Sequence, residues 1–120
     1  NIILRSNGKL KRDYVYVDDV SNAYFLLMKK LMKNKNKLFV YNIGSKHNLS
    51  VKDLVNKIIK KFSNSRVKII IKNYSKNELV NQKLNHSKIK KELGWKQKYE
   101  LGHGLIKTID WYKKNINFFI

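Results

Sequence analysis

The chain has 120 residues, 42% of them hydrophobic, and a formal net charge of +19 from 27 basic and 8 acidic residues. This length allows one small domain with a core, and the absence of cysteine excludes disulfides, a thiol nucleophile and cysteine-ligated metal. The longest apolar runs are too short to cross a bilayer, and the N-terminal residues lack the layout of a signal peptide. We therefore expect a soluble cytoplasmic protein without a membrane partner.

The positive charge by itself suggests a nucleic acid or another anionic surface as partner. Arginine, the usual reader of base edges and phosphates, is present only as Arg5, Arg12 and Arg66. The lysines are spread over the polar sides of all expected helices, which is typical of a solvated surface. A small basic nucleic-acid-binding or interaction domain is thus the alternative function, and we expect no specific nucleic-acid partner.

The first third of the chain is expected to contain a strand, an extended segment and a helix. Residues 1–5 favour a strand, and the alternating residues 14–17 favour extended backbone. Asp18 or Asp19 is expected to cap a helix from about residue 19 to 33. Apolar side chains at i, i+3, i+4 and i+7 predict that this helix buries one face. They are Val20, Ala23, Tyr24, Leu27 and Leu31.

The middle of the chain is expected to form a strand followed by a second helix. Residues 38–45 predict a strand that ends on glycine. Ser50, with Asp53 three residues later, resembles a capping box at a helix start. The apolar face predicted for this helix consists of Leu54, Val55, Ile58, Ile59 and Phe62.

The last part of the chain is expected to contain one strand and two helices. Residues 67–71 predict a strand and residues 72–82 an irregular segment. A short third helix, capped within residues 85–87, should end at Gly94, and a fourth helix spans about residues 101–116. Strands that alternate with helices indicate an α/β fold. Trp95, Leu105, Trp111 and Tyr112 are expected in the core.

The chain lacks the motifs that carry dehydrogenase chemistry. No glycines form the cradle that a dinucleotide needs, because residues 102–104 contain only a lone G-x-G. No tyrosine is followed four residues later by lysine, and His47, His86 and His103 lack metal-ligand spacing. We therefore expect no catalytic residue and no metal site in this chain.

Four segments of the chain have a characteristic order and spacing. Residues 12–20 are RDYVYVDDV, residues 42–45 are NIGS ahead of Ser50, residues 87–96 are SKIKKELGWK, and residues 101–112 are LGHGLIKTIDWY. Together they are similar to the C-terminal part of NAD-dependent nucleotide-sugar epimerases and dehydratases, within the extended short-chain dehydrogenase family. Residues 3–8 and 77–79 resemble the CDP-glucose 4,6-dehydratase branch.

This resemblance implies that residues 1–120 form a single segment, the C-terminal substrate-binding lobe of a longer enzyme. The implied fold is α/β, with about four helices and three to four short strands, and lacks the Rossmann nucleotide-binding core. The family carries NAD and its catalytic residues in an N-terminal Rossmann domain, so no cofactor is expected in this segment. The implied parent enzyme is a lyase of cell-surface polysaccharide (lipopolysaccharide) biosynthesis or, within the family, a 4-epimerase. Its partners would be a nucleotide-diphosphate sugar, the Rossmann domain and a second copy in a homodimer.

The resemblance also implies substrate contacts at the start of the extended segment predicted at residues 14–17. Arg12 would reach the pyrophosphate, because a planar guanidinium matches phosphate oxygens; the alternative is a local ion pair with Asp13. Tyr14 would stack on a base or sugar, or else is a half-buried strand residue.

Further candidates lie at the end of the 38–45 strand and in the irregular segment. Asn42 and Ser45 occupy a strand's C-terminal end, where open α/β sheets bind ligands, although Asn42 alternatively satisfies the turn backbone. Glu78 and Asn85 would line the nucleotide pocket. Asn85 replaces the aspartate of many family members and so removes one charge from the substrate side.

Overall fold

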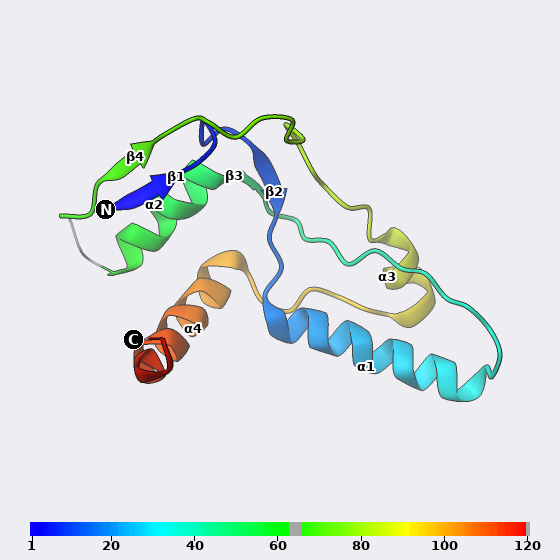
Figure 1. Cartoon of the computed structure of the whole chain (residues 1–120). Helices are drawn as coiled ribbons and strands as arrows, with labels where there is room; N and C mark the ends of the chain where they lie inside the picture. The colour runs from blue at the N-terminus through cyan, green and yellow to red at the C-terminus, as the bar shows by residue number, and fades with distance from the viewer. Residues whose placement is uncertain (63–65, 120) are drawn as a thin grey trace.

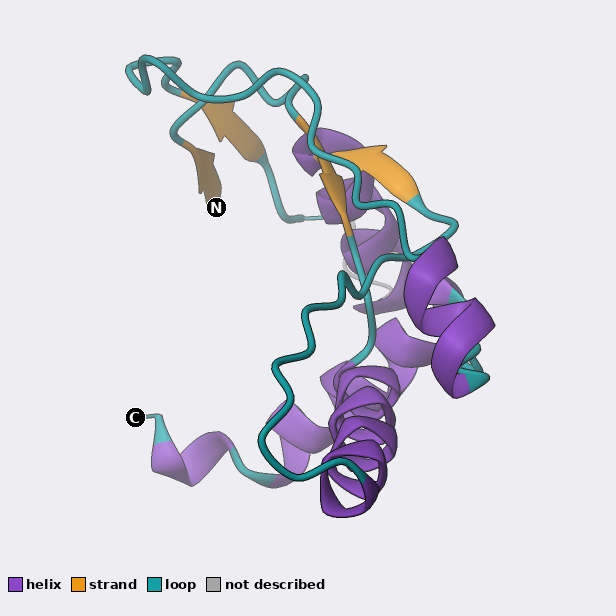
Figure 2. Cartoon of the chain, turned by 90° about the vertical axis from the view of Figure 1, so that its right-hand side faces the viewer, coloured by secondary structure: helices purple, strands orange, loops and turns teal. Residues whose placement is uncertain are grey.

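A computed structural model describes residues 1–62 and 66–119 of the chain. Ser63, Asn64 and Ser65, polar residues that predict the end of the second helix, lie outside these ranges. The molecule is elongated, with extents of 53 × 36 × 24 Å. The strands gather at one end with one helix beside them, while two helices lie together at the other end (Figures 1 and 2). The elements are β1 Ile2–Leu4, β2 Lys11–Asp13, α1 Val17–Lys33, β3 Asn48–Ser50, α2 Val51–Phe62, β4 Ile69–Ile71, α3 Ser87–Leu93, α4 Leu101–Lys114 and the 3-10 helix η1 Ile116–Phe118.

The strands form two separate pairs. β1 pairs in parallel with β4, and β2 pairs antiparallel with β3 so that Arg12 lies opposite Leu49. On its other side β2 receives residues 80–82, through a parallel bridge from Lys11 to Asn81. β2 is therefore enclosed by two chain segments, and the residues that follow it are held in place from both sides.

The core lies between α1, α3 and the connector that follows α3. Ala23, Ile89 and Trp95 form its buried cluster. The Trp95 indole N–H donates to the backbone oxygen of Asp19 at 2.9 Å, so this large side chain is both packed and oriented. Partly buried side chains that pack against the cluster are Leu26, Tyr41, Ile43 and Leu93.

Three predicted helix ends are confirmed. The Ser50 hydroxyl accepts the Asp53 N–H at 3.1 Å and donates to the Asp53 carboxylate at 2.7 Å at the start of α2. The Asn85 side-chain oxygen accepts the N–H of Ser87 at 2.9 Å, where α3 begins. Gly94 ends α3 with φ 66°, a left-handed conformation that glycine adopts at low cost. These signals depend on neighbouring residues alone.

The start of α1 differs from the prediction. The helix begins at Val17, two residues early, and neither Asp18 nor Asp19 caps it. Asp19 is fully buried, and its carboxylate accepts the N–H groups of Lys98 at 2.8 Å and Tyr99 at 3.1 Å. The predicted cap is wrong because a distant connector supplies backbone donors that satisfy the carboxylate better than the helix end does.

The strand predicted at residues 38–45 is also wrong, because residues 37–45 carry no regular structure. The extended backbone predicted at residues 14–17 holds at Tyr16, while the paired strand β2 lies before it, at Lys11–Asp13, where β3 provides a hydrogen-bonding partner. A strand needs a neighbour to pair its backbone groups, and residues 38–43 pair with no strand in the described part of the chain.

Side chains hold the 38–43 segment instead. The Lys30 ammonium donates to the Tyr41 hydroxyl at 2.6 Å and to the Glu92 carboxylate at 2.8 Å, while the Tyr41 hydroxyl donates to Glu92 at 2.6 Å. These bonds lower the pKa of Glu92, the bond from Lys30 contributing most, and the bond to Glu92 raises the pKa of Lys30. The segment is thus tied to α1 and α3 through one charged contact.

We expect the Lys30–Glu92 contact to make a small stability contribution that acid removes. Because the folded-state pKa of Glu92 lies below its ordinary value of 4.5, the contribution is present above that pH and is lost as pH falls through the folded pKa. Urea unfolding should show a midpoint gap between the native chain and Glu92→Gln at pH 7 that closes as the pH falls below the folded-state pKa of Glu92. Asp110→Asn, which alters an exposed acid without a partner in the described residues, should show no such gap at either pH.

Large apolar faces remain uncovered by the described residues. The apolar side chains of α2 follow the predicted face, yet no described side chain of this helix is fully buried. Trp95 is buried as predicted and Leu105 is half-buried, but Trp111 and Tyr112 are exposed by 53% and 48%, so the core prediction is wrong for these two. Tyr24 and Leu31 of α1, which the sequence predicts on the buried face, are likewise exposed. Within the described ranges, no helix is long and apolar enough to cross a membrane.

Candidate ligand-binding site

Asp13, the last residue of β2, joins three chain segments. One carboxylate oxygen accepts the backbone N–H of Ser45 at 2.8 Å and its hydroxyl at 2.6 Å. The other oxygen accepts the N–H of Leu84 at 3.1 Å. The end of β2, the 42–45 segment and the 78–85 segment therefore meet at one carboxylate. Asp13 therefore orients two loops that lie far from it in the sequence.

Gly44 permits this close meeting. A methyl carbon on Gly44 would lie 2.6 Å from the Leu84 carbonyl oxygen, 2.9 Å from the Asp13 carboxylate and 3.1 Å from Nδ1 of His86. Real side-chain carbons do not approach backbone oxygen so closely. The glycine of the NIGS segment is therefore required by close backbone approach.

Arg12 is held at the mouth of the same cluster. Its guanidinium donates to the Leu79 carbonyl at 2.7 Å, to the Lys11 carbonyl at 2.8 Å and to the Glu78 carboxylate at 2.9 Å. The local ion pair with Asp13 is wrong, because Glu78 is the acid that Arg12 contacts. A guanidinium has five N–H donors, so two are unused by the described residues. Arg12 is thus pre-oriented with donors to spare.

Glu78 receives a second contact that fixes its carboxylate. The hydroxyl of Ser75 donates to the oxygen of Glu78 that does not contact Arg12. Both candidate residues, Arg12 and Glu78, are therefore brought together by the structure. The pair is partly exposed, with Arg12 at 24%, so its charge is accessible to a ligand.

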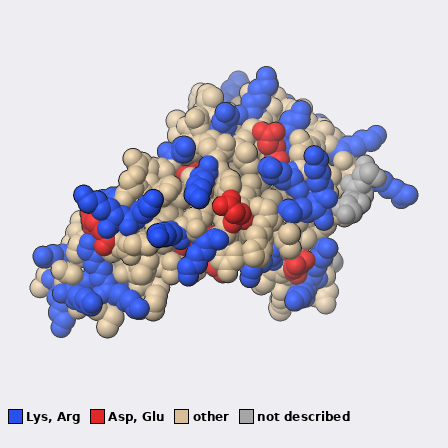
Figure 3. All heavy atoms as spheres, turned by 180° about the vertical axis from the view of Figure 1, so that it is seen from behind, with Lys and Arg blue, Asp and Glu red and all other residues tan. Residues whose placement is uncertain are grey.

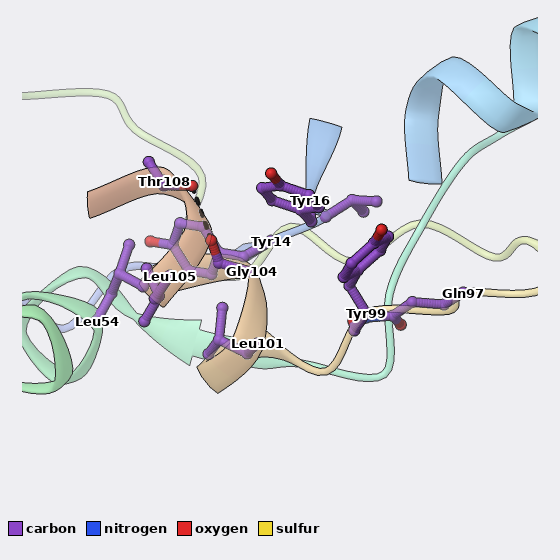
Figure 4. Close-up of a pocket in the computed structure, with 10 residues that line it drawn as sticks. Tyr14, Tyr16, Leu54, Gln97, Tyr99, Leu101, Gly104, Leu105 and Thr108 are labelled. Carbon is purple, nitrogen blue, oxygen red and sulfur yellow. Dashed lines mark hydrogen bonds between the residues drawn. The ribbon is translucent and has the colours of Figure 1, made fainter. Parts of the chain in front are cut away.

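Tyr14 lines an apolar cavity of about 130 Å³ between α2 and α4 (Figure 4). Burial raises the pKa of Tyr14, and the nearby Arg12 charge partly opposes this. Leu54, Tyr99 and Leu105 line the same cavity. The structure thus places Tyr14 among apolar and aromatic side chains as a half-buried residue, and its stacking on a ligand stays a prediction.

The other candidates differ in accessibility. Ser45 is 1% exposed, and its hydroxyl donates a hydrogen bond to the Asp13 carboxylate, so this hydroxyl faces inward. Asn42 is exposed, and its side chain has no hydrogen-bond partner among the described residues. Asn85 is exposed at the start of α3, where its oxygen accepts the Ser87 N–H. Arg12, Glu78, Asn42 and Asn85 are therefore the candidates with polar atoms near the surface.

Sequence reasoning missed Asn48, which closes the cluster from β3. Its amide nitrogen donates to the Asn81 side chain at 2.9 Å, and its Oδ1 is buried without a hydrogen-bond partner in the described part of the chain. No motif marked Asn48, because its partner lies 33 residues away.

The glycines do not form an NAD site. Gly44 is enclosed by protein atoms, and Gly104 packs its backbone against the Tyr16 ring, where a methyl carbon would lie 3.0 Å from that side chain. Gly8 and Gly94 adopt left-handed turns, and Gly102 lies in the first turn of α4. A dinucleotide cradle needs closely spaced glycines between a strand and a helix, so the residues present do not fit the cofactor. The described residues also hold no group of His, Asp or Glu suited to a metal.

The geometry defines a class of protein: a small α/β unit whose loops, tied to the end of one strand, present an oriented arginine–glutamate pair. The sequence model of the family described as GDP-mannose 4,6 dehydratase matches residues 2–108. The chain therefore belongs to this family of nucleotide-sugar epimerases and dehydratases, as the four-segment resemblance predicts.

Individual relatives agree with this assignment. A trifunctional UDP-glucose 4,6-dehydratase/3,5-epimerase/reductase of Arabidopsis thaliana is 33% identical over 93% of this chain and 16% of its own length. A probable GDP-L-fucose synthase of Oryza sativa is 29% identical over 96% of this chain and 33% of its own length. The chain thus spans a third or less of these relatives.

Solved structures confirm the predicted fold class. UDP-glucose 4-epimerase of Thermotoga maritima, solved with UDP-glucose, superposes with a TM-score of 0.80 at 30% identity, covering 97% of this chain and 36% of that one. The dTDP-glucose 4,6-dehydratase of Bacillus anthracis, in complex with NAD, gives 0.74 at 26% identity, covering 94% and 34%. The prediction that members of the family carry NAD is confirmed by this relative, which holds it.

Proposed function

We propose that residues 1–120 are the substrate-binding lobe of an NAD-dependent nucleotide-sugar 4,6-dehydratase that acts on a CDP-glucose-like substrate. The observation that carries the proposal is Arg12, held by Glu78 and by the Leu79 carbonyl with two donors unused by the described residues. A fixed guanidinium with free donors is suited to a pyrophosphate. Membership of the family supports the nucleotide-sugar class, and residues 3–8 and 77–79 support the CDP-glucose branch.

The other candidates then surround the pyrophosphate-binding arginine. Glu78 and Asn85 contact the nucleotide, Asn42 contributes its unpaired amide, and Ser45 shapes the loop through Asp13. Tyr14 contributes through the neighbouring cavity. Glu78, Asn85 and Asn42 are polar, exposed and on two loops tied to Asp13, so we place them on one ligand-facing edge.

A missing N-terminal Rossmann domain supplies NAD and the catalytic residues in this proposal, and the whole enzyme works in the cytoplasm as a homodimer in cell-surface polysaccharide (lipopolysaccharide) biosynthesis. The division of labour is supported by the share of relatives that this chain spans, 33% for the rice protein. A 4-epimerase is the second candidate, favoured by the likeness to UDP-glucose 4-epimerase.

Titration of the chain with nucleotide sugars tests the Arg12 assignment. At physiological salt we expect saturable amide shifts around Arg12 and Asn42, strongest with CDP-glucose among CDP-, UDP- and dTDP-glucose. Arg12→Ala should weaken binding at least about tenfold, the scale of one lost charge-assisted contact. Arg12→Lys, which keeps the charge without the fork, should lie in between.

Arg5→Ala is the matched control, since Arg5 is exposed and lies outside the cluster. If Arg5→Ala and Arg12→Ala weakened nucleotide-sugar binding equally, the loss would reflect only the removal of one positive charge, and Arg12 would not be the binding residue. A response to a DNA duplex with sequence preference, together with none to any nucleotide sugar, would replace the proposal by the nucleic-acid alternative. A preference for UDP- or dTDP-glucose would contradict the CDP assignment alone.

A further inference from the structure

A second hollow, of about 370 Å³, lies where the start of α3 meets the connector that follows it. None of the six candidate substrate residues lines this hollow, and no acidic residue does so. Its lining residues are Lys46, His86, Lys90, Trp95, Lys96 and Gln97.

The three lysines of the hollow lack acidic partners. Lys46, Lys90 and Lys96 come from three different segments, and none forms an ion pair within residues 1–62 and 66–119. Like charges that converge on one concave surface repel one another and concentrate the field there. An anion in the hollow would relieve that repulsion.

The walls of the hollow are fixed by the fold. The Gln97 side chain accepts the N–H of Lys46 at 3.2 Å and donates to the Tyr99 carbonyl at 2.7 Å, which ties the two loops together. Trp95 is 1% exposed and forms the floor. The lysine side chains therefore extend from a fixed backbone, and little order must be imposed on that backbone when a ligand binds.

His86 adds an unsatisfied polar group. Its Nδ1 is buried and has no hydrogen-bond partner in the described part of the chain. The ring meets Trp95 edge-on, with 5.7 Å between centroids, and the backbone of Gly44 lies behind it. Unpaired buried polar atoms are rare in folded proteins and call for an explanation. Because Nδ1 faces the Gly44 backbone, the ring can present only its other nitrogen, Nε2, to the hollow.

We propose that this hollow is a phosphate-binding site, separate from the nucleotide-sugar site, that takes inorganic phosphate or a small phosphomonoester. The lysines neutralise the charge of the anion, and the His86 ring offers its other nitrogen, Nε2, to a phosphate oxygen. The Trp95 ring is too deeply buried to stack on a base, so the ligand needs no aromatic part. This site would let phosphate-bearing metabolites bind the lobe without competing for Arg12.

Basic side chains are spread over the face seen from behind (Figure 3), and the chain has 27 of them, so a test must separate the hollow from general charge. Inorganic phosphate, titrated at physiological salt, is the probe, followed by the amide shifts of residues 46, 86, 90 and 97. One variant carries Lys46→Gln, Lys90→Gln and Lys96→Gln. The control carries Lys9→Gln, Lys35→Gln and Lys37→Gln, which remove the same charge from exposed positions outside every described pocket.

We expect saturable binding that the hollow variant weakens at least about tenfold and the control variant less than about twofold. His86→Phe should also weaken phosphate binding while leaving the lysines in place. Equal loss in both lysine variants, or no saturable shift, would overturn the site.

Arg12→Ala in the same titration distinguishes this site from the proposed function. Phosphate binding in the hollow should stay within about twofold of the native value, whereas nucleotide-sugar binding is lost. If CDP-glucose displaced phosphate from residues 46, 86, 90 and 97, the hollow would be part of the substrate site, and its independence would be refuted.

Discussion

Gly44→Ala is expected to lower the free energy of unfolding by about 3 kcal/mol, the upper end of the cost of overpacking. The added methyl would lie 2.6 Å from the Leu84 carbonyl oxygen, a backbone atom that cannot swing away as a side chain can. Relief requires the 42–45 and 78–85 segments to separate. That separation pulls Ser45 and Leu84 from the Asp13 carboxylate.

Urea unfolding of the chain measures this cost. With a slope of about 1.5 kcal/mol per molar urea, typical of a small domain, the midpoint should fall by about 2 M. The amide signals of Ser45 and Leu84 should shift most, because both groups donate to Asp13. Nucleotide-sugar binding through Arg12 should weaken as well, since residues 78–85 position Glu78.

Gly102→Ala is the matched control for this substitution. A methyl on Gly102 meets nothing nearer than 4.0 Å, the flexible end of Lys61, and the position lies in the first turn of α4. Alanine favours a helix over glycine, so the control should be neutral or stabilise the chain by about 0.5 kcal/mol. A Gly44→Ala midpoint equal to that of Gly102→Ala would contradict the close approach at Asp13.

Features that depend on neighbouring residues could be predicted from the sequence. The left-handed end of α3 at Gly94, the Ser50–Asp53 contact and the apolar side of α2 each follow from residues within a few positions. The four-segment resemblance, which compares whole motifs, predicted the family and the fold class.

Features that depend on distant partners could not be predicted from spacing. Residues 38–45 have strand propensity, yet propensity supplies no neighbour with which to pair. Arg12 forms its ion pair with Glu78, which lies 66 positions away, and not with the adjacent Asp13. Only folding brings these groups together, and the same holds for the hollow around His86, whose lysines come from three segments.

Asp19→Ala is expected to cost about 4 kcal/mol, the second large effect. The Asp19 carboxylate is fully buried and accepts two backbone N–H groups, those of Lys98 and Tyr99. A hydrogen bond to a charged group contributes about 1.5–3 kcal/mol, and buried donors left unpaired add their own penalty. Alanine removes both acceptors and leaves a void beside Trp95, whose indole N–H binds the Asp19 backbone oxygen.

Asp18→Ala separates this effect from the general benefit of an acid at a helix start. Asp18 is exposed in the first turn of α1, so its loss should cost only the interaction with the helix dipole, about 0.5 kcal/mol. Asp19→Asn should fall between the two, because an amide oxygen replaces one acceptor while its NH₂ group faces the other donor. Urea midpoints for the three variants, with the amide shifts of residues 98 and 99, measure the difference. Similar midpoints for Asp18→Ala and Asp19→Ala would mean that the connector is held by Trp95 packing alone, and that the buried carboxylate does not tie α1 to the wall of the Tyr14 cavity.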